Sequence, residues 1–298
     1  MSWSVDQIPN QSGKLVLITG SNSGIGLEAA KVLAKQQAHV VLACRNPEKG
    51  TAALEEIKAE IPTATVDFMQ LDLASLDSVR SFTEAFKAKF DHLDVLINNA
   101  GVMAPPFGTT ADGFESQFGT NHLGHFALTG QLLPLLEAAE SGRVVVLSSI
   151  AHRMGKINFN NLNSEKRYSR WIAYGQSKLA NLMFAKELQR RLEKAGSKVV
   201  AVAAHPGYSS TNLQRYMPGA GVMNKLAQSQ FEGAMPTLFA ATEAGIRGGE
   251  YVGPDGWMEI KGAPKIAYVA KKARNAEVAA KLWDVSESMT NVKYLTAS

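Results

Sequence analysis

The amino-acid sequence predicts an α/β fold in which a doubly wound, mostly parallel sheet carries helices on both faces. Short runs rich in Val, Ile and Leu alternate with longer amphipathic segments, and this alternation is typical of consecutive strand–helix–strand units. The short runs are apolar almost throughout, as expected of strands that are covered on both sides. Hydrophobic residues make up 45% of the 298 residues, which suffices for a large core and argues against general disorder.

The alternation places the elements in order along the chain. Strands are expected at Leu15–Thr19, His39–Ala43, Thr65–Gln70, Val95–Asn98, Val144–Ser148 and Val199–Ala203. Long helices are expected at Ile25–Lys35, Pro47–Glu60, Leu76–Phe90, Gly113–Leu136 and Trp171–Ala195. Ser75 and Asp77 stand where the third helix should be capped. Because ligands bind beyond the carboxyl ends of the strands in such a sheet, the segments that follow the strands form the candidate site.

Composition and charge exclude several classes of protein. The 31 Lys and Arg residues against 27 Asp and Glu residues give a net charge of only +4, and no basic run forms a footprint for nucleic acid. The single cysteine, Cys44, excludes an intramolecular disulfide and a cysteine-rich zinc site. The polar N-terminus and the lack of an apolar stretch of roughly 18 residues predict a cytoplasmic protein without a membrane span.

A glycine-rich turn follows the first expected strand and precedes a helix. It reads Thr19-Gly20-Ser21-Asn22-Ser23-Gly24-Ile25-Gly26. Glycine lets the backbone approach a pyrophosphate closely, and the helix N-terminus offers unpaired N–H groups to it. The spacing is neither Gly-x-Gly-x-x-Gly nor a P-loop, and structural turns also use glycine. Its position directly after the first strand is what favours a nucleotide-binding site here.

The next strand ends indicate which nucleotide is bound. An NAD site normally carries Asp or Glu after the second strand, whereas this chain reads Ala43-Cys44-Arg45-Asn46. A carboxylate would repel a 2′-phosphate, and Arg45 can pair with one. The missing acid and the arginine both favour NADP, although Arg45 could also be a plain surface residue. Asp72-Leu73 could contact the adenine or form a turn, and Asn98-Asn99-Ala100-Gly101 suits close packing around a ribose.

Tyr174 and Lys178 lie four residues apart, on one face of an expected helix. A free tyrosine has a pKa near 10, and a neighbouring ammonium group lowers that pKa, so the pair is suited to acid–base chemistry. Chance also produces this spacing on long helices. Ser148 and Ser149 end the fifth expected strand, on the ligand side of the sheet.

Taken in order, these motifs resemble the short-chain dehydrogenase/reductase family over nearly the whole chain. The resemblance implies one Rossmann domain, spanning 1–298, and an NADP(H)-dependent enzyme that transfers hydride between the nicotinamide and a small carbonyl or alcohol substrate. It implies a catalytic group of Asn121, Ser149, Tyr174 and Lys178, with Tyr174 as the acid or base and Ser149 as the hydrogen-bond donor to the substrate oxygen. It also implies that the nicotinamide lies beside Pro206, Gly207 and Thr211, and that the residues of the strand ends bind the rest of the cofactor, namely Gly20, Ser21, Asn22, Ser23, Gly24, Ile25, Gly26, Arg45, Asp72, Leu73, Asn99, Ala100 and Gly101.

Within the family, the chain is most similar to the retinol-dehydrogenase-like group. The matching stretches are Ala43–Arg45, Ser148–His152, Tyr174–Asn181, Leu282–Glu287 and a polar insertion at Gly155–Arg170. The chain lacks the N-terminal membrane segment of the microsomal members, so the resemblance implies neither a membrane location nor a retinoid. By resemblance, the backbone of Asn121 holds a water that links Lys178 to solvent, and helices bearing Asn121 and Tyr174 form the interface of a homodimer or homotetramer.

The segments outside the motifs carry further expectations. Residues 1–13 and 253–298 are expected to be extensions, and 208–235, rich in Gly, Met and Ser, to close over the nicotinamide as a lid. With Met103, Phe107 and Trp171 this lid suggests a lipophilic substrate pocket, although core packing explains such residues equally well.

Three alternatives to this interpretation stay open. His122 and His125 could be metal ligands, but they lack an acidic partner and a third ligand, so no metal is expected. A non-catalytic NADP-binding, redox-sensing protein would share the fold, but Tyr174 and Lys178 are both present. A sugar-nucleotide epimerase could use the same pair, but it usually carries a longer region after the residue equivalent to Gly207.

Overall fold

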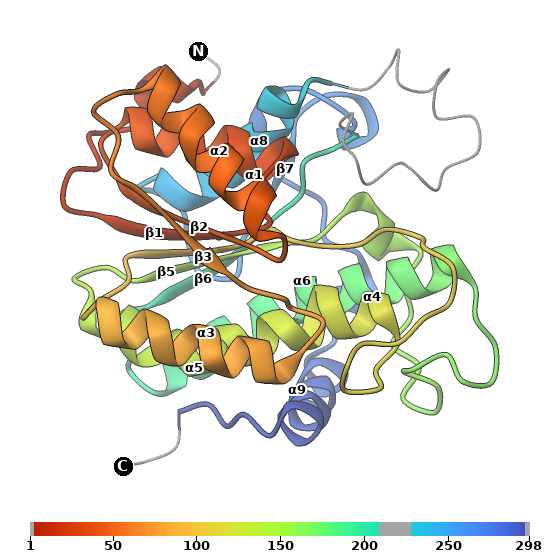
Figure 1. Cartoon of the computed structure of the whole chain (residues 1–298). Coiled ribbons are helices and arrows are strands. Elements are labelled where there is room, and N and C mark those ends of the chain that lie inside the picture. The colour runs from red at the N-terminus through yellow and green to blue at the C-terminus, as the bar shows by residue number, and fades with distance from the viewer. Residues whose placement is uncertain (1–2, 209–227, 296–298) are drawn as a thin grey trace.

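The computed structural model describes residues 3–208 and 228–295, which form one eight-stranded sheet between two layers of helices (Figure 1). The strand order is β3-β2-β1-β4-β5-β6-β7-β8. Pairings from β3 through β7 are parallel, and β8 joins β7 in the antiparallel direction. The predicted α/β class, with a doubly wound and mostly parallel sheet, is therefore confirmed.

The strands begin and end close to the predicted residues. They are β1 (Leu15–Thr19), β2 (His39–Cys44), β3 (Val66–Gln70), β4 (Val95–Asn98), β5 (Arg143–Leu147), β6 (Val200–Ala204), β7 (Tyr251–Pro254) and β8 (Pro264–Ile266). Strands β7 and β8 were not predicted, because β7 ends in glycine and proline, which are unusual inside strands, and β8 has only three residues.

The helices follow the strands in alternation. They are α1 (Gly24–Lys35), α2 (Pro47–Glu60), α3 (Leu76–Lys89), α4 (Ser116–Phe118), α5 (Gly124–Ala138), α6 (Arg170–Lys194), α8 (Gln230–Thr242) and α9 (Ala276–Thr290). The side chain of Ser75 accepts a hydrogen bond from the N–H of Ser78, which confirms the predicted cap of α3. A π-helical segment, Gly119–Leu123, joins α4 to α5.

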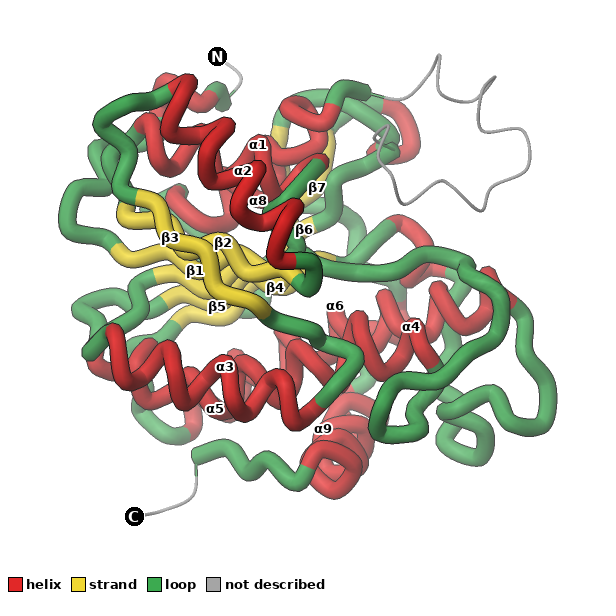
Figure 2. Tube along the Cα trace, viewed as in Figure 1, coloured by secondary structure: helices red, strands yellow, loops and turns green. Residues whose placement is uncertain are grey.

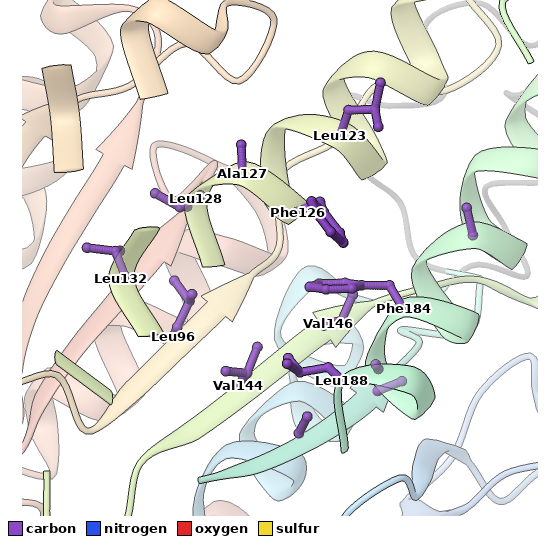
Figure 3. Packing of buried hydrophobic residues seen from close by; sticks show 14 of the residues in the cluster. Leu96, Leu123, Phe126, Ala127, Leu128, Leu132, Val144, Val146, Phe184 and Leu188 are labelled. Atoms are coloured by element: carbon purple, nitrogen blue, oxygen red, sulfur yellow. The ribbon is translucent and has the colours of Figure 1, made fainter. Parts of the chain in front are cut away.

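Each face of the sheet has its own core. Figure 2 shows α1, α2 and α8 on one side of the strands and α3, α5, α6 and α9 on the other. Alternation along β1 divides its side chains, so that Val16 and Ile18 join the first core and Leu17 joins the second. In the second core, Phe126 of α5 and Phe184 of α6 pack beside Val146 of β5 (Figure 3).

Segments at both ends of the chain add to this framework. The ring of Trp3 packs edge-on against Phe239 of α8, with centroids 5.4 Å apart. Past residue 253 the chain contributes β8 and α9. Most of the segment expected to form a lid, 209–227, lies outside the described residues, and so does Thr211. In the part of the chain that the structure covers, no helix is both long and apolar enough to cross a bilayer.

The strand order fixes where a ligand can enter. The chain winds outward from β1 to β2 and β3, and then returns to place β4 on the other side of β1. The direction of winding thus reverses between β1 and β4, and in such sheets the usual ligand site lies at the carboxyl ends of the strands beside this point.

Candidate active site

A cavity of about 300 Å³ opens at the carboxyl ends of the central strands. Most of the predicted cofactor residues line it, and they come from the turn after β1, the ends of β2, β3 and β4, helix α6 and the segment after β6. They are Gly20, Asn22, Ser23, Gly24, Ile25, Gly26, Arg45, Asp72, Leu73, Asn99, Ala100, Gly101, Tyr174, Lys178 and Pro206. Residues that the sequence analysis missed also line it, among them Ala43, Leu71, Val102, Thr120 and Leu147.

The glycine-rich turn is packed directly against the end of β4. Gly20 has a φ of +66°, and a Cβ atom there would lie 2.8 Å from the Cα of Ala100. A Cβ atom on Gly26 would lie 2.5 Å from the side-chain nitrogen of Asn99. Glycine is required at both positions, and the resulting close approach leaves the first turn of α1 facing the cavity.

A buried network that the sequence analysis did not predict joins the two strand ends. The Thr19 hydroxyl accepts hydrogen bonds from the N–H groups of Asn99 and Ala100, each at 3.0 Å, and lies 2.8 Å from Nε2 of His125. Nδ1 of His125 lies 3.0 Å from the carbonyl oxygen of Asn121. Burial lowers the pKa of His125 to about 4, so the neutral ring donates from Nδ1 to Asn121 and accepts from Thr19 through Nε2.

A basic residue lines the cavity at the end of β2. Arg45 is exposed at the end of β2, and its backbone oxygen accepts a hydrogen bond from the Gln70 side chain at 3.1 Å. Its neighbour Cys44 is buried. Asp72 lines the cavity and also forms a turn, because its Oδ1 accepts the N–H of Ala74 at 3.0 Å.

The polar residues at the other end meet around Tyr174, which is 7% exposed. Its side chain is hydrogen-bonded to Ser149. Nζ of Lys178 lies 5.8 Å from the Tyr174 ring centroid and donates to the carbonyl oxygen of Leu147 at 3.1 Å. Ser148 lines the cavity and Ser149 does not, but the hydroxyl of Ser148 is engaged elsewhere, because it donates to the backbone oxygen of Lys178 at 2.7 Å.

The pKa of Tyr174 differs from the sequence-based expectation. Burial raises the pKa of Tyr174 to about 12, and the hydrogen bond with Ser149 opposes this rise. We expected Lys178 to lower the Tyr174 pKa; instead its ammonium group points to Leu147, and burial lowers the pKa of Lys178 itself to about 8. At neutral pH the hydroxyl of Tyr174 therefore keeps its proton, which suits a proton donor.

Asn121 lies in the π-helical segment, between Gly119 and Gly124. Its side chain is fully buried and is held by both backbone groups of Val102, at 2.8 and 2.9 Å. The amide nitrogen also donates to the hydroxyl of Ser177 in α6 at 3.0 Å. A π-helical turn shifts the register of the backbone and is common at functional sites.

Several predicted residues lie away from the cavity. Ser21 does not line the cavity, and its hydroxyl turns inward and donates to the carbonyl oxygen of Ile18 at 2.8 Å. Gly207 packs on Ile260 instead of lining the cavity. Nε2 of His122 lies 2.8 Å from the Ser286 hydroxyl, while His125 contacts Thr19. Among the described residues no group of three or more His, Cys, Asp or Glu side chains is arranged to hold a metal.

Comparison with known proteins agrees with this geometry. The family model for short chain dehydrogenases matches residues 14–219. The chain belongs to the short-chain dehydrogenase family. This short-chain dehydrogenase is 43% identical to mouse retinol dehydrogenase 11 over 281 residues (92% of this chain and 85% of the relative), and 42% identical to human retinol dehydrogenase 12 over 288 residues (95% and 88%). These relatives confirm the likeness to the retinol-dehydrogenase group.

Solved structures extend the comparison. An uncharacterised protein from Mycobacterium paratuberculosis is 44% identical, with a TM-score of 0.84 over 99% of this chain and 100% of that one. A short chain dehydrogenase from Salmonella enterica, at 24% identity, shares the fold with a TM-score of 0.67 over 82% and 97% of the two chains. The short-chain dehydrogenase thus has the Rossmann architecture of its family.

Of the residues expected in a lipophilic pocket, one contacts the catalytic candidate directly. The Trp171 ring meets the ring of Tyr174 edge-on, with centroids 6.2 Å apart. Phe107 is 53% exposed and packs against Tyr168. No sequence motif marks Val102 or Thr120 as cavity residues, because they come from segments without a regular pattern.

Proposed function

We propose that the protein is an NADP(H)-dependent oxidoreductase that reduces a lipophilic aldehyde or ketone, or oxidises the matching alcohol. The observation that carries the proposal is the buried Tyr174, hydrogen-bonded to Ser149 and one helical turn from Lys178, at a cavity that the glycine-rich turn and the ends of the central strands also line. The glycines at positions 20 and 26 support a pyrophosphate site, because a Cβ atom at either position would clash with Ala100 or Asn99 and push the turn away from the end of β4.

The contacts support a separate role for each residue in the reaction. The bound cofactor supplies or accepts hydride at the substrate carbon. In reduction, Tyr174 gives its proton to the substrate oxygen, and the Ser149 hydroxyl donates a hydrogen bond to the same oxygen as negative charge develops there. Ser149 rather than Ser148 fits this role, because the hydroxyl of Ser148 is engaged by the backbone of α6. The cation of Lys178 stabilises charge next to Tyr174 and is placed to bind the nicotinamide ribose.

The substrate class rests on the apolar surroundings of Tyr174 and on the relatives. Trp171 covers one side of Tyr174, and the relatives carry the name retinol dehydrogenase. A long apolar alcohol or its aldehyde is therefore the first substrate class to test. A cytoplasmic location and a homo-oligomer are part of the same proposal.

The test is a screen of aldehydes, ketones and alcohols in which NADPH or NADP⁺ is followed by absorbance. We expect turnover with long-chain aldehydes in the presence of NADPH. NADPH binding without turnover of any carbonyl would favour the non-catalytic, redox-sensing alternative.

Cofactor preference has its own test at Arg45. The change Arg45→Asp places a carboxylate where the 2′-phosphate would lie, so we expect NADPH affinity to fall at least about 10-fold, because a charge-assisted pair is replaced by a repulsive one. NADH affinity should change little. Titration of both cofactors measures the effect, with Lys58→Asp on the exposed end of α2 as the charge-matched control. An equal loss for NADH and NADPH would contradict a role for Arg45 in binding the 2′-phosphate.

A further inference from the structure

The short turn after β7 has an unusual backbone. Met258 and Glu259 have φ values of 51° and 60°, which side chains other than glycine and asparagine seldom adopt. The turn leaves Trp257 and Met258 exposed and directs Glu259 inward, where only 8% of it is exposed. Consecutive left-handed residues persist where surrounding contacts hold them, often at functional sites.

The Glu259 carboxylate reaches three separate segments. Its Oε2 atom lies 2.5 Å from Nη2 of Arg153 and 3.3 Å from Nε2 of His205. Its Oε1 atom accepts the N–H of Tyr268 at 2.8 Å. Arg153 also lies over the ring of Tyr268, 5.3 Å from its centroid. One buried carboxylate therefore joins the chain after β5, after β6 and after β8.

The link to the segment after β5 leads to Ser149. Ser149 caps a short 3₁₀ helix, Ile150–Arg153, and Arg153 is the last residue of that helix. A second route runs through His152, whose Nδ1 donates to the carbonyl oxygen of Ser149 at 2.7 Å and whose Nε2 accepts the N–H of Ala270 at 3.3 Å. Both sets of contacts hold the backbone of the segment that carries Ser149, whose side chain is hydrogen-bonded to Tyr174.

The link to the segment after β6 leads to Pro206 and Gly207. Nδ1 of His205 accepts the N–H of Gly207 at 3.2 Å, so the proton of the neutral ring lies on Nε2. Nε2 lies 3.3 Å from Oε2 of Glu259, a close polar contact without the geometry of a hydrogen bond. The carbonyl oxygen of Ile260 accepts the N–H of Tyr208 at 2.8 Å. The turn at Glu259 thus holds the backbone on both sides of Gly207.

We propose that Glu259 is a positioning residue, which fixes the segment carrying Ser149 relative to the segment carrying Pro206 and Gly207 through Arg153 and His205. The importance of this position for catalysis rests on the proposed function; the structural coupling does not. Each of the two segments leaves the sheet at its own strand end, and Glu259 supplies a charged contact common to both.

The primary test is Glu259→Gln, which keeps the shape and the acceptor for Tyr268 but removes the charge that Arg153 pairs with. We expect kcat for carbonyl reduction to fall at least about 10-fold, since small displacements of catalytic groups are costly, while the dissociation constant of NADPH stays within about 2-fold. Glu259→Asp, which keeps the charge, should recover part of kcat. Glu277→Gln on the exposed start of α9 is the control.

Hydrogen–deuterium exchange separates this proposal from the proposed function, because it needs no turnover. In Glu259→Gln we expect faster exchange in peptides covering 150–156 and 203–208, and unchanged exchange in 15–26 and 276–290. Unchanged exchange in both of the first two peptides would overturn the proposal even if the protein were an active reductase. If Glu259→Gln exchanged faster in these two peptides but the wild-type protein had no reductase activity, the positioning role of Glu259 would stand and only the proposed function would be rejected.

A second variant tests the same coupling without changing the sequence of the turn itself. Arg153→Met removes the partner cation and leaves residues 256–260 unaltered, and it should speed exchange in the same two peptides. The matched control is Arg80→Met, which breaks the exposed pair between Arg80 and Asp77. Exchange that rises only in 256–260, or equally throughout the chain, would contradict a positioning role.

Discussion

Lys178 carries an ionisable group into a site from which water is almost excluded. It is 6% exposed, and burial lowers its pKa from 10.5 to about 8. Below pH 8 the folded and unfolded chains both hold the proton, so the folded state bears the full cost of burying the charge. Between pH 8 and 10.5 the folded chain releases the proton and the unfolded chain keeps it, so stability rises with pH.

Replacing this lysine should therefore stabilise the protein while abolishing activity. We expect Lys178→Met to raise the free energy of unfolding at pH 7 by about 3 kcal/mol, because that is the difference implied by a pKa lowered from 10.5 to about 8. The carbonyl oxygen of Leu147 keeps a donor, because Asn181 also bonds to it at 2.9 Å. Urea unfolding at pH 7 and at pH 10 measures the effect, which should shrink at the higher pH.

The control for this prediction is Lys194→Met at the exposed end of the same helix. Its effect should be small and independent of pH over this range. If Lys178→Met destabilised the protein equally at both pH values, the effect would not depend on the charge of Lys178, and the account of its burial would be wrong.

At the scale of elements, the contacts among the end of β1, the end of β4 and the π-helical segment fix the shape of the cavity beside the glycine-rich turn. The fully buried side chains of Thr19 and His125 and the backbone of the half-buried Asn99 and Ala100 satisfy one another's hydrogen bonds. Every lone pair and proton of the Thr19 hydroxyl is used. Such a fully paired network fixes the spacing between the two turns more tightly than apolar packing would.

Removal of the Thr19 hydroxyl tests this network. In Thr19→Val the two N–H groups and Nε2 of His125 lose their partner, so we expect a loss of about 3 kcal/mol in the free energy of unfolding and weaker NADPH binding. The control is Thr237→Val in α8, where the buried hydroxyl lacks a hydrogen-bond partner among the described residues, so the change should be neutral or stabilising. Equal effects from the two substitutions, measured by urea unfolding, would contradict the assigned network.

Helix α9 is a second element whose packing contributes to the fold. The Trp283 ring lies 5.1 Å from Phe126 of α5 and 4.5 Å from Tyr294, between centroids. The helix thus covers, within one chain, part of the surface of α5 and α6. A homo-oligomer built on these two helices would have to accommodate α9, and the predicted subunit interface stays a prediction.

The contribution of α9 is measurable through Trp283. Trp283→Ala should lower the free energy of unfolding by about 3–5 kcal/mol, because the ring is buried among aromatic side chains. Trp257→Ala, at a ring that is 79% exposed, should stay within about 0.5 kcal/mol of wild type. Thermal or urea unfolding of both variants gives the comparison, and similar losses would show that α9 is not part of the core.

At the scale of the whole molecule, the sequence predicted what depends on local pattern. Strand periodicity located β1 to β6, and the rule that ligands bind at strand ends located the turn at Gly20 and the pair Tyr174 and Lys178. The hydrogen bonds of Thr19 with His125 could not be predicted from local pattern, because they join residues that are far apart in sequence. The same holds for Glu259, whose partners lie on segments that only the folded sheet brings together.

The direction of the Tyr174 pKa was predicted wrongly for a related reason. Sequence spacing places Lys178 one turn away, but it does not reveal that the ammonium group binds Leu147 or that the phenol is buried. These depend on the depth of the cavity, which is a property of the assembled molecule. A protonated Tyr174 is the form that the reductive direction needs.

The most direct test of the central claim compares wild type with Tyr174→Phe in carbonyl reduction and in NADPH binding. The variant lacks only the hydroxyl, so we predict a kcat lower by at least about 10³-fold, within the range assigned to general acid catalysis, and an NADPH dissociation constant within about 2-fold of wild type. Turnover of Tyr174→Phe at the wild-type rate would contradict the assignment of Tyr174 as the proton donor.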